Sequence, residues 1–217
     1  MNNTDFVSRI DHLVMGAVDL TSGQNYVQQI FGALPVIGGT HPTMGTHNCL
    51  LRIGPSSYLE IISINQDIEQ PKRPHWFDLD KLLPNNEPKL LTWVVRTNNI
   101  QAVVSKSKIS FGRIEKMKRG NLEWLITIRK NGSMPLHGIC PTLIQWQTGG
   151  HPTDKLPESG CSLIRLESFH PKAKWIKNTL TSIGFQDKFI VEKGEEMVKP
   201  SLIAYFETPN GQKKITS

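Results

Sequence analysis

Short apolar runs separated by turn signals alternate along this sequence with segments whose apolar residues have helical spacing. Residues 9–18 read as a buried strand, and residues 20–33 as an amphipathic helix capped by Thr21 or Ser22. Three more strands are expected at residues 34–40, 46–54 and 57–64. The predicted order is therefore strand, helix, strand, strand, strand.

The same order recurs twice further along the chain. The second unit has a strand at 89–98, a helix at 99–109 and three strands between 112 and 148. The third has a strand at 161–168, a helix at 171–184 and three strands between 187 and 217. This pattern predicts an α+β fold of repeated βαβββ modules, which form curved mixed sheets around a cleft with helices on their convex faces.

Two Pro-rich linkers divide the chain. We expect residues 1–150 to form one domain of two paired modules, 8–66 and 89–149, joined by the linker 67–88. Residues 151–217 are expected to form the third unit. Its strands carry apolar residues on both faces, and one chain supplies no fourth module to cover the second face. We therefore predict that this unit mediates a homodimer; the competing interpretation is that it folds back onto the first two modules.

Two polar residues interrupt the apolar strands of the first module. His12 shares a face of its strand with Val14, and Glu60 shares a face of its strand with Tyr58 and Ile62. Both can point into the concavity. A carboxylate in a buried strand is costly without a compensating partner, so this pair is the main candidate for chemistry.

Composition narrows the function only slightly. The chain of 217 residues has a net charge of +6 and 38% hydrophobic residues. No apolar run is long enough to cross a membrane and no signal core follows the first residues, so we expect a cytoplasmic protein without a membrane partner. The basic segments 113–120 and 170–177 lack the aromatic pattern of a single-strand binder, and no nucleic-acid partner is expected. Three widely spaced cysteines indicate neither a disulfide framework nor a zinc finger.

The sequence resembles the vicinal oxygen chelate superfamily, and within it the glyoxalase-like proteins related to glyoxalases, bleomycin resistance proteins and extradiol dioxygenases. The resemblance rests on the order and spacing of four segments: DHLVMGAVDL, HPTMGTHNCLLRIGPSSYLEII, RPHWFDLD and CPTLIQWQTGGHP. It implies a cleft between paired modules, usually with a divalent metal ion as cofactor. The family includes lyases, dioxygenases and epimerases, and also proteins that bind a drug without chemistry, so the fold does not choose the function.

Carried over to this chain, the resemblance implies a metal site with His12 and Glu60 as ligands. The second module offers Thr92, a poor ligand, and Gln145, which matches the position of Glu60 to within one residue. Glu60 would be both ligand and catalytic base. The alternative is that His12 and Glu60 hydrogen-bond each other or a ligand without any metal.

Other residues are candidates for contact with a substrate. His41 lies on a Gly-rich connection, and His47 is expected at the rim of the cleft. Arg73 and Trp76 of the linker could hold a planar or carboxylate group, or simply anchor the linker. Trp146 is expected in the core or the cleft wall.

Two functions are consistent with these expectations. The first is metal-assisted chemistry of the lyase, isomerase or dioxygenase type on a small oxygenated molecule. The second is a non-catalytic protein that binds a small molecule or drug between apolar walls. In either case the partner is a small-molecule substrate or ligand, whose identity the sequence does not give.

Overall fold

The computed structural model describes residues 6–147, 150–194 and 200–217, so the ends of the predicted ranges at 1–5 and 148–149 lie outside the described residues. The first two modules have the predicted order. Their elements are β1 Ser8–Gly16, α1 Leu20–Phe31, β2 Val36–His41, β3 Thr46–Gly54, β4 Ser57–Ile64, β5 Lys89–Thr97, α2 Ile100–Lys106, β6 Arg113–Arg119, β7 Leu122–Ile128 and β8 Thr142–Trp146. Short 3₁₀ turns at Pro42–Met44, Trp76–Lys81, Pro135–Gly138 and Pro152–Asp154 punctuate the connections.

The third unit also has the predicted elements: β9 Ser162–Phe169, α3 Ala173–Ser182, β10 Phe189–Glu192, β11 Ser201–Glu207 and β12 Lys213–Thr216. Its strands pair differently from those of the first two modules. They form a separate four-stranded sheet in the order β10-β9-β11-β12, with β10 parallel to β9. The third unit thus repeats the element order of the modules but not their topology.

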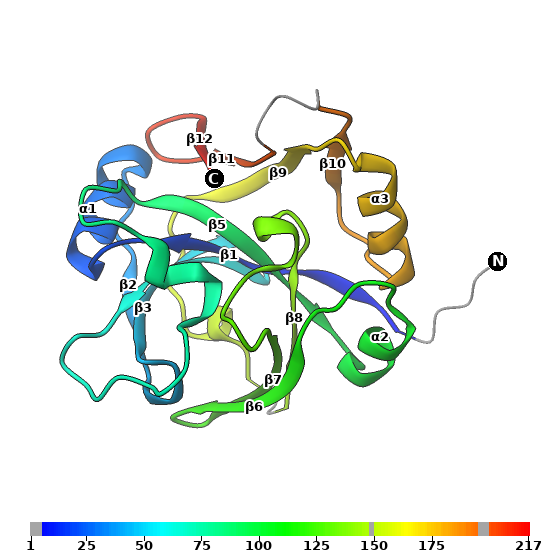
Figure 1. Ribbon diagram of the computed structural model, residues 1–217. Coiled ribbons are helices and arrows are strands. Elements are labelled where there is room, and N and C mark those ends of the chain that lie inside the picture. The colour runs from blue at the N-terminus through cyan, green and yellow to red at the C-terminus, as the bar shows by residue number, and fades with distance from the viewer. Residues whose placement is uncertain (1–5, 148–149, 195–199) are drawn as a thin grey trace.

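One eight-stranded sheet carries both modules, in the order β2-β3-β4-β1-β5-β8-β7-β6. The two modules join where β1 and β5 run antiparallel, and within each module the first strand is parallel to the last. The sheet curls, with α1 and α2 on its convex side (Figure 1). The α+β class and the curved mixed sheet of paired modules are as the sequence predicts.

The first helix shows how local signals fix an element. Asp19, rather than the expected Thr21 or Ser22, caps α1, because its side chain accepts a hydrogen bond from the backbone of Ser22 at 2.8 Å. Gly32 ends the helix with φ of 73°, a left-handed conformation that glycine adopts without strain.

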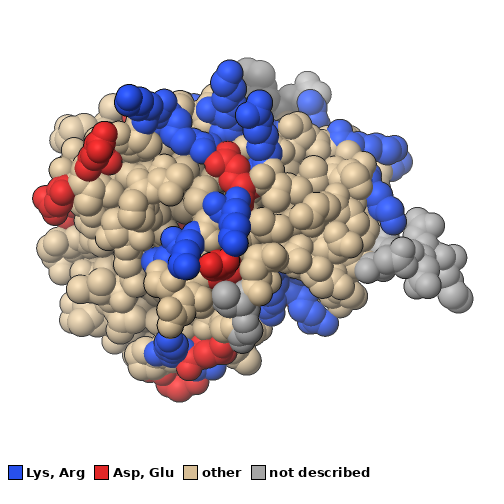
Figure 2. Space-filling view, turned by 90° about the horizontal axis from the view of Figure 1, so that it is seen from below, with Lys and Arg blue, Asp and Glu red and all other residues tan. Residues whose placement is uncertain are grey.

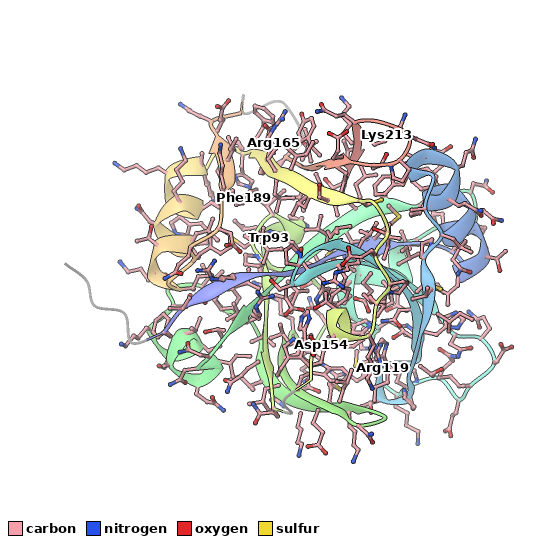
Figure 3. All side chains as sticks on the ribbon, turned by 180° about the vertical axis from the view of Figure 1, so that it is seen from behind. Trp93, Arg119, Asp154, Arg165, Phe189 and Lys213 are labelled. Carbon is pink, nitrogen blue, oxygen red and sulfur yellow. The ribbon has the colours of Figure 1, made fainter. Side chains whose placement is uncertain are left out.

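The third unit folds back onto the convex side of the main sheet. In Figure 1 the strands β9, β11 and β12 lie above β5 and β1. Figure 3 shows Trp93 and Phe189 between the two sheets, with ring centroids 4.8 Å apart, while Arg165 and Lys213 lie on the outer side. Phe31 of α1 and Phe206 of β11 pack at 4.8 Å.

This packing is the one expected if the third unit covers the first two modules. One face of the small sheet, with Leu166, Leu202 and Ala204, is buried in the common core. The other face is partly exposed and holds an Arg165–Tyr205 contact. The packing onto the modules therefore covers only one face of the third unit, and the second face, which led us to predict a homodimer, stays partly exposed in the described chain; the homodimer itself stays a prediction.

A connector, residues 150–161, runs from β8 to the third unit across the edge of the first module. Leu156 packs with Leu50 and Tyr58, and its carbonyl accepts a hydrogen bond from Arg52. Ser159 donates to the carbonyl of Arg52 at 2.6 Å. The connector thus covers part of the concave side of the sheet.

The surface and the cysteines give little sign of a specialised partner. On the face in Figure 2, Lys and Arg side chains are interleaved with acidic ones. No helix in the described part of the chain is long and apolar enough to span a membrane. Cys49, Cys140 and Cys161 are free and buried.

Candidate functional site

The concave side of the eight-stranded sheet holds a small, nearly closed cleft between the two modules. Its polar lining consists of His12, His41, Asn48, Tyr58, Glu60 and Arg119. Its apolar lining consists of Trp76, Phe77, Trp124, Ile126, Ile144 and Trp146. The cavity between these side chains has a volume of about 20 Å³, which is enough for one water molecule. A larger ligand has to extend beyond this cavity or displace some of its walls.

A β-bulge in β1 brings two consecutive polar residues to the cleft side of the sheet. The pairing with β5 shifts between Ile10 and His12, so that Asp11 is the extra residue. In a regular strand Asp11 would face away from His12. Here its carboxylate lies 2.7 Å from Nδ1 of His12.

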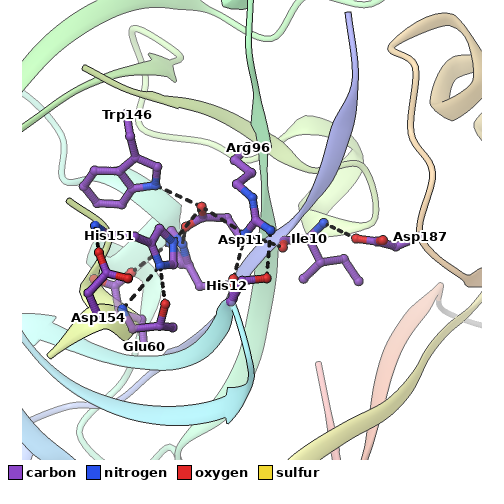
Figure 4. A network of polar contacts seen from close by, with 11 residues as sticks. Ile10, Asp11, His12, Glu60, Arg96, Trp146, His151, Asp154 and Asp187 are labelled. Carbon is purple, nitrogen blue, oxygen red and sulfur yellow. Dashed lines mark hydrogen bonds and ion pairs between the residues drawn. The ribbon is translucent and has the colours of Figure 1, made fainter. Parts of the chain in front are cut away.

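Asp11 is the centre of a buried polar network (Figure 4). Its Oδ2 accepts hydrogen bonds from Nε1 of Trp146 at 2.9 Å and from Nε2 of His151 at 3.1 Å, and Arg96 lies 3.8 Å away. Its side chain is fully buried. Burial alone would raise the pKa of Asp11, but the hydrogen bonds and charges of His12 and His151 outweigh it and hold this pKa well below the usual range. Asp11 is therefore an ionised carboxylate that orients the residues around it.

Glu60 faces His12 across the cleft. Nε2 of His12 lies 3.6 Å from Oε2 of Glu60, so the structure brings together the two residues that the strand pattern singled out. Because Asp11 takes the Nδ1 hydrogen of His12, Nε2 is the nitrogen directed toward Glu60. The amide of Asn48 donates to Oε1 of Glu60, and the ring of Tyr58 stacks on His12 at 4.6 Å.

The pairing of β3 with β4 corrects the expectation for His47. A tight hairpin without a bulge would place Leu51 opposite Glu60, but Leu50 lies there, because the register shifts between Arg52 and Gly54. This one-residue slip exchanges the faces of β3. Asn48 consequently lines the cleft, and His47 lies on the other face and does not line it.

His41 lies in the cleft wall and contacts a residue of the second module. Its Nε2 is 3.1 Å from Arg119, its Nδ1 is 3.2 Å from the hydroxyl of Thr46, and its ring meets Trp76 edge-on. Burial, followed by the charge of Arg119, lowers the pKa of His41 to about 3. The imidazole is therefore neutral near pH 7, accepting from Arg119 at Nε2 and donating to Thr46 at Nδ1.

Gln145 does not belong to the cleft. Its side-chain oxygen accepts a hydrogen bond from the backbone of Ile100 at 2.8 Å, on the helix side of β8. The expectation that Gln145 lies in the cleft as a metal ligand is corrected, because Gln145 is on the opposite face of β8 from Ile144 and Trp146, and successive residues of a strand alternate between its faces. Ile144 and Trp146 line the cleft instead.

Of the two candidates in the linker, Trp76 lines the cleft and Arg73 does not. Trp76 is 4% exposed and forms part of the cleft wall. Arg73 does not line the cleft, because it makes a two-pronged ion pair with Glu115 at 2.6 and 2.9 Å. Its expected role as a substrate contact in this cleft is therefore corrected. Thr92 is buried and donates to the carbonyl of Gly138.

Sequence reasoning missed Asp11, Asn48, Arg119 and His151. The pair Asp11–His12 within an apolar strand was a signal, because two adjacent polar residues suggest a bulge. His151 and Arg119 gave no such signal. They reach the site from the connector and from the end of β6, and only the folded chain places them there.

Members of the vicinal oxygen chelate superfamily often use a divalent metal ion, so the possible ligands in the cleft can be compared with what such an ion needs. His12 Nε2 and Glu60 Oε2 are close enough to contact one cation. They are only two ligands, however, and the described part of the chain contains no group of three His, Cys, Asp or Glu side chains suited to a metal. Resident catalytic sites usually have three protein ligands. The guanidinium of Arg119 lines the same cleft and its charge opposes a cation. These residues therefore do not fit a resident divalent ion.

Comparison with known proteins identifies the family. The model of the glyoxalase-like domain family matches residues 10–184, most of the chain, and this chain belongs to that family, within the vicinal oxygen chelate superfamily. No curated protein sequence matches the chain.

Several solved structures are similar to this chain at low sequence identity. A hypothetical protein from Staphylococcus aureus is 15% identical to this chain, and the match covers 87% of this chain and 87% of that protein, with a TM-score of 0.58. Methylmalonyl-CoA epimerase from Mycobacterium tuberculosis is 13% identical over 63% of this chain and 85% of its own, with a TM-score of 0.42. A methylmalonyl-CoA epimerase in complex with methylmalonyl-CoA is 17% identical over 67% of this chain and 99% of its own, with a TM-score of 0.45. At 15% identity the likeness to the first of these concerns the fold alone, and the TM-scores of the two epimerases are too low to support any argument.

Proposed function

We propose that this protein is an enzyme of the isomerase or lyase type, which moves a proton at a carbon next to a carbonyl group in a small molecule. The observation that carries the proposal is the buried pair of Glu60 and His12. Glu60 is 6% exposed, and the imidazole beside it is oriented by a fully buried carboxylate. Ionisable groups held out of water at such cost are typical of catalytic sites.

The geometry supports distinct roles for the two side chains. Glu60 is the base: its carboxylate takes the proton as the substrate C–H bond breaks, and the electron pair moves toward the carbonyl oxygen. In the imidazolium form, His12 donates from both nitrogens, from Nδ1 to Asp11 and from Nε2 toward that oxygen. Return of the proton to carbon restores both side chains. No step needs a metal ion, in line with the donor set of the cleft.

The dioxygenase alternative loses support from the same residues. Non-haem iron dioxygenases bind their metal with two histidines and one carboxylate. The cleft offers His12 and Glu60, while the imidazole of His41 is committed to Arg119 and Thr46. The lyase and isomerase types remain because they need only a positioned base and a donor.

A deuterium-exchange experiment tests the proposal. The protein is incubated in D₂O with a panel of small 2-oxo acids, 3-oxo acids, their esters and aldehydes, and loss of the C–H signal is followed by NMR. We expect exchange above the uncatalysed rate for at least one compound. We expect Glu60→Gln to lower this rate by about 10²–10⁴-fold, the usual contribution of a general base. The control Glu123→Gln changes the same group on the surface, where it pairs with Lys116 and Lys118. Equal rates in wild type and Glu60→Gln would contradict the role of Glu60.

The second candidate function is ligand binding without chemistry. The aromatic wall favours it, because Trp76, Trp124 and Trp146 surround the cleft, with Trp124 and Trp146 in contact at 5.5 Å. Binding of a panel compound without any exchange would support this function over the enzymatic one.

A further inference from the structure

Arg119 enters the cleft through a space that two glycines leave open. It is the last residue of β6 in the second module, and its side chain crosses to β2 of the first. A Cβ atom at Gly39 would lie 2.9 Å from Cδ of Arg119, and one at Gly38 would collide with the side chain of Asn48. The Gly-Gly pair thus makes room for the guanidinium and its amide partner.

Only one end of this guanidinium is used by the protein. Nη1 donates to Nε2 of His41 and to Oδ1 of Asn48, both at 3.1 Å. Nε and Nη2 have no hydrogen-bond partner within residues 6–147, 150–194 and 200–217. Nε and Nη2 form one of the two-pronged edges with which arginine binds a carboxylate.

The charge of Arg119 is also without a direct counter-ion. Both of its partners are uncharged, since His41 is neutral and Asn48 is an amide. No described carboxylate lies within ion-pair distance of it, whereas Arg73 pairs with Glu115 and Arg165 with Glu167. Glu60 is reached only through Asn48, whose amide nitrogen donates to it. A partly buried cation in a cleft calls for an anion from outside the chain.

Trp76 supplies a second, independent observation. It lines the same cleft and is 4% exposed, yet its indole N–H is buried and has no hydrogen-bond partner in the described structure. A buried donor left in this state is destabilising, which native proteins generally avoid. Trp76 and Arg119, which both line the cleft, therefore each have a donor without a partner among the described residues.

We propose that the cleft binds a small organic acid, whose carboxylate is held by the free edge of Arg119 and whose flat apolar body lies against the tryptophans. This deepens the proposed function and rests on it for the chemistry. Asn48 bonds Arg119 with its oxygen and Glu60 with its nitrogen. The side-chain amide of Asn48 thus bridges Arg119, which would hold the carboxylate, and Glu60, which would act as the base. The reacting carbon of the acid would therefore lie only a few bonds from its carboxylate.

The test compares benzoate with benzamide, which has nearly the same shape but no charge. Binding of each probe to the full chain is measured by titration calorimetry. We expect benzoate to bind at least about tenfold more tightly than benzamide. Arg119→Gln should remove this preference, and Arg119→Lys, which keeps the charge but not the fork, should retain part of it. Thermal unfolding of each variant verifies that it is folded.

Lys118→Gln is the matched control, because it removes one positive charge from the neighbouring residue, which pairs with Glu123 on the surface. It should keep the full preference. Equal affinity for the two probes, no binding of benzoate, or an unchanged preference in Arg119→Gln would overturn the proposal.

The outcomes also separate this inference from the proposed function. Glu60→Gln should retain the preference for benzoate, because Glu60 does not contact the guanidinium. A benzoate preference without any proton exchange would refute the enzymatic role and leave the acid site. The reverse result is proton exchange on neutral compounds that Arg119→Gln does not affect, together with equal binding of benzoate and benzamide. It would refute the acid site and leave the enzymatic role.

Discussion

Asp11→Asn is the most informative single change, because it replaces one oxygen of the buried carboxylate by an amide of nearly the same shape. Oδ1 of Asp11 binds His12, and Oδ2 binds both Trp146 and His151. Asparagine has one acceptor oxygen. Whichever way the amide turns, its NH₂ group faces at least one of these N–H donors.

The magnitude can be worked out from these contacts. A hydrogen bond to a charged group contributes about 1.5–3 kcal/mol, and a buried donor left unpaired adds about 1–3 kcal/mol. Breaking a buried charged network by removing one partner costs about 3–5 kcal/mol in other proteins. We therefore expect Asp11→Asn to lower the free energy of unfolding at pH 7 by about 3–5 kcal/mol.

The effect should depend on pH with a defined sign. The pKa of Asp11 is lower in the folded chain than in the unfolded chain, so the ionised carboxylate stabilises the fold above its unfolded pKa of about 3.9. This stabilisation is lost progressively as the pH falls below that value. The difference between wild type and Asp11→Asn should accordingly shrink in acid.

Urea unfolding of both proteins at pH 7 and near pH 3 measures this difference. The exposed Asp67 gives a control, since Asp67→Asn should change stability by less than about 0.5 kcal/mol. A loss below about 1 kcal/mol for Asp11→Asn at pH 7, or the same loss at both pH values, would refute the buried network as described.

Two further predictions concern His41 and metal content. The pKa of His41 is about 3 in the folded chain, below its unfolded value of about 6.5, so its contribution to stability is present above pH 6.5 and is lost as the pH falls toward 3, by at most about 5 kcal/mol. Over this pH range the free energy of unfolding of wild type should fall more steeply than that of His41→Gln. Parallel pH dependences of the two proteins in urea unfolding would contradict a neutral buried imidazole. Protein purified without chelator should contain far less than one divalent metal ion per chain by elemental analysis. One tightly held ion per chain that is lost in His12→Ala would contradict the conclusion that the cleft residues do not fit a resident divalent ion.

The order of elements could be predicted from the sequence, because it depends on short-range patterns. Apolar spacing of about 3.6 or 2 distinguishes helix from strand within a few residues, and the pattern is consistent in all three units. The same alternation placed His12 and Glu60 on one face of the first module. In the structure Nε2 of His12 and Oε2 of Glu60 are 3.6 Å apart, because β1 and β4 pair in parallel with Val14 opposite Glu60.

The face of a side chain near an irregularity could not be determined in this way. A single extra residue in β1 brings Asp11 to the side of His12, and a register shift in the hairpin of β3 and β4 exchanges His47 for Asn48. Gln145 was placed in the cleft for a different reason: β8 pairs with β5 and β7 without a register shift, but the sequences of the two modules could be matched only to within one residue. The face of each strand residue depends on the number of residues before it, so one bulge reverses the faces of all later residues in that strand.

The sequence by itself determined the α+β class, the repeated modules and the pair of His12 and Glu60, since each rests on local spacing. Only the tertiary structure decided that the third unit covers the convex side, that the connector brings His151 to Asp11, and that Arg119 crosses from the second module to His41. The last two contacts join residues 140 and 78 positions apart. Such contacts depend on how whole sheets pack, because burial of apolar area is non-directional and leaves no periodic mark on the sequence.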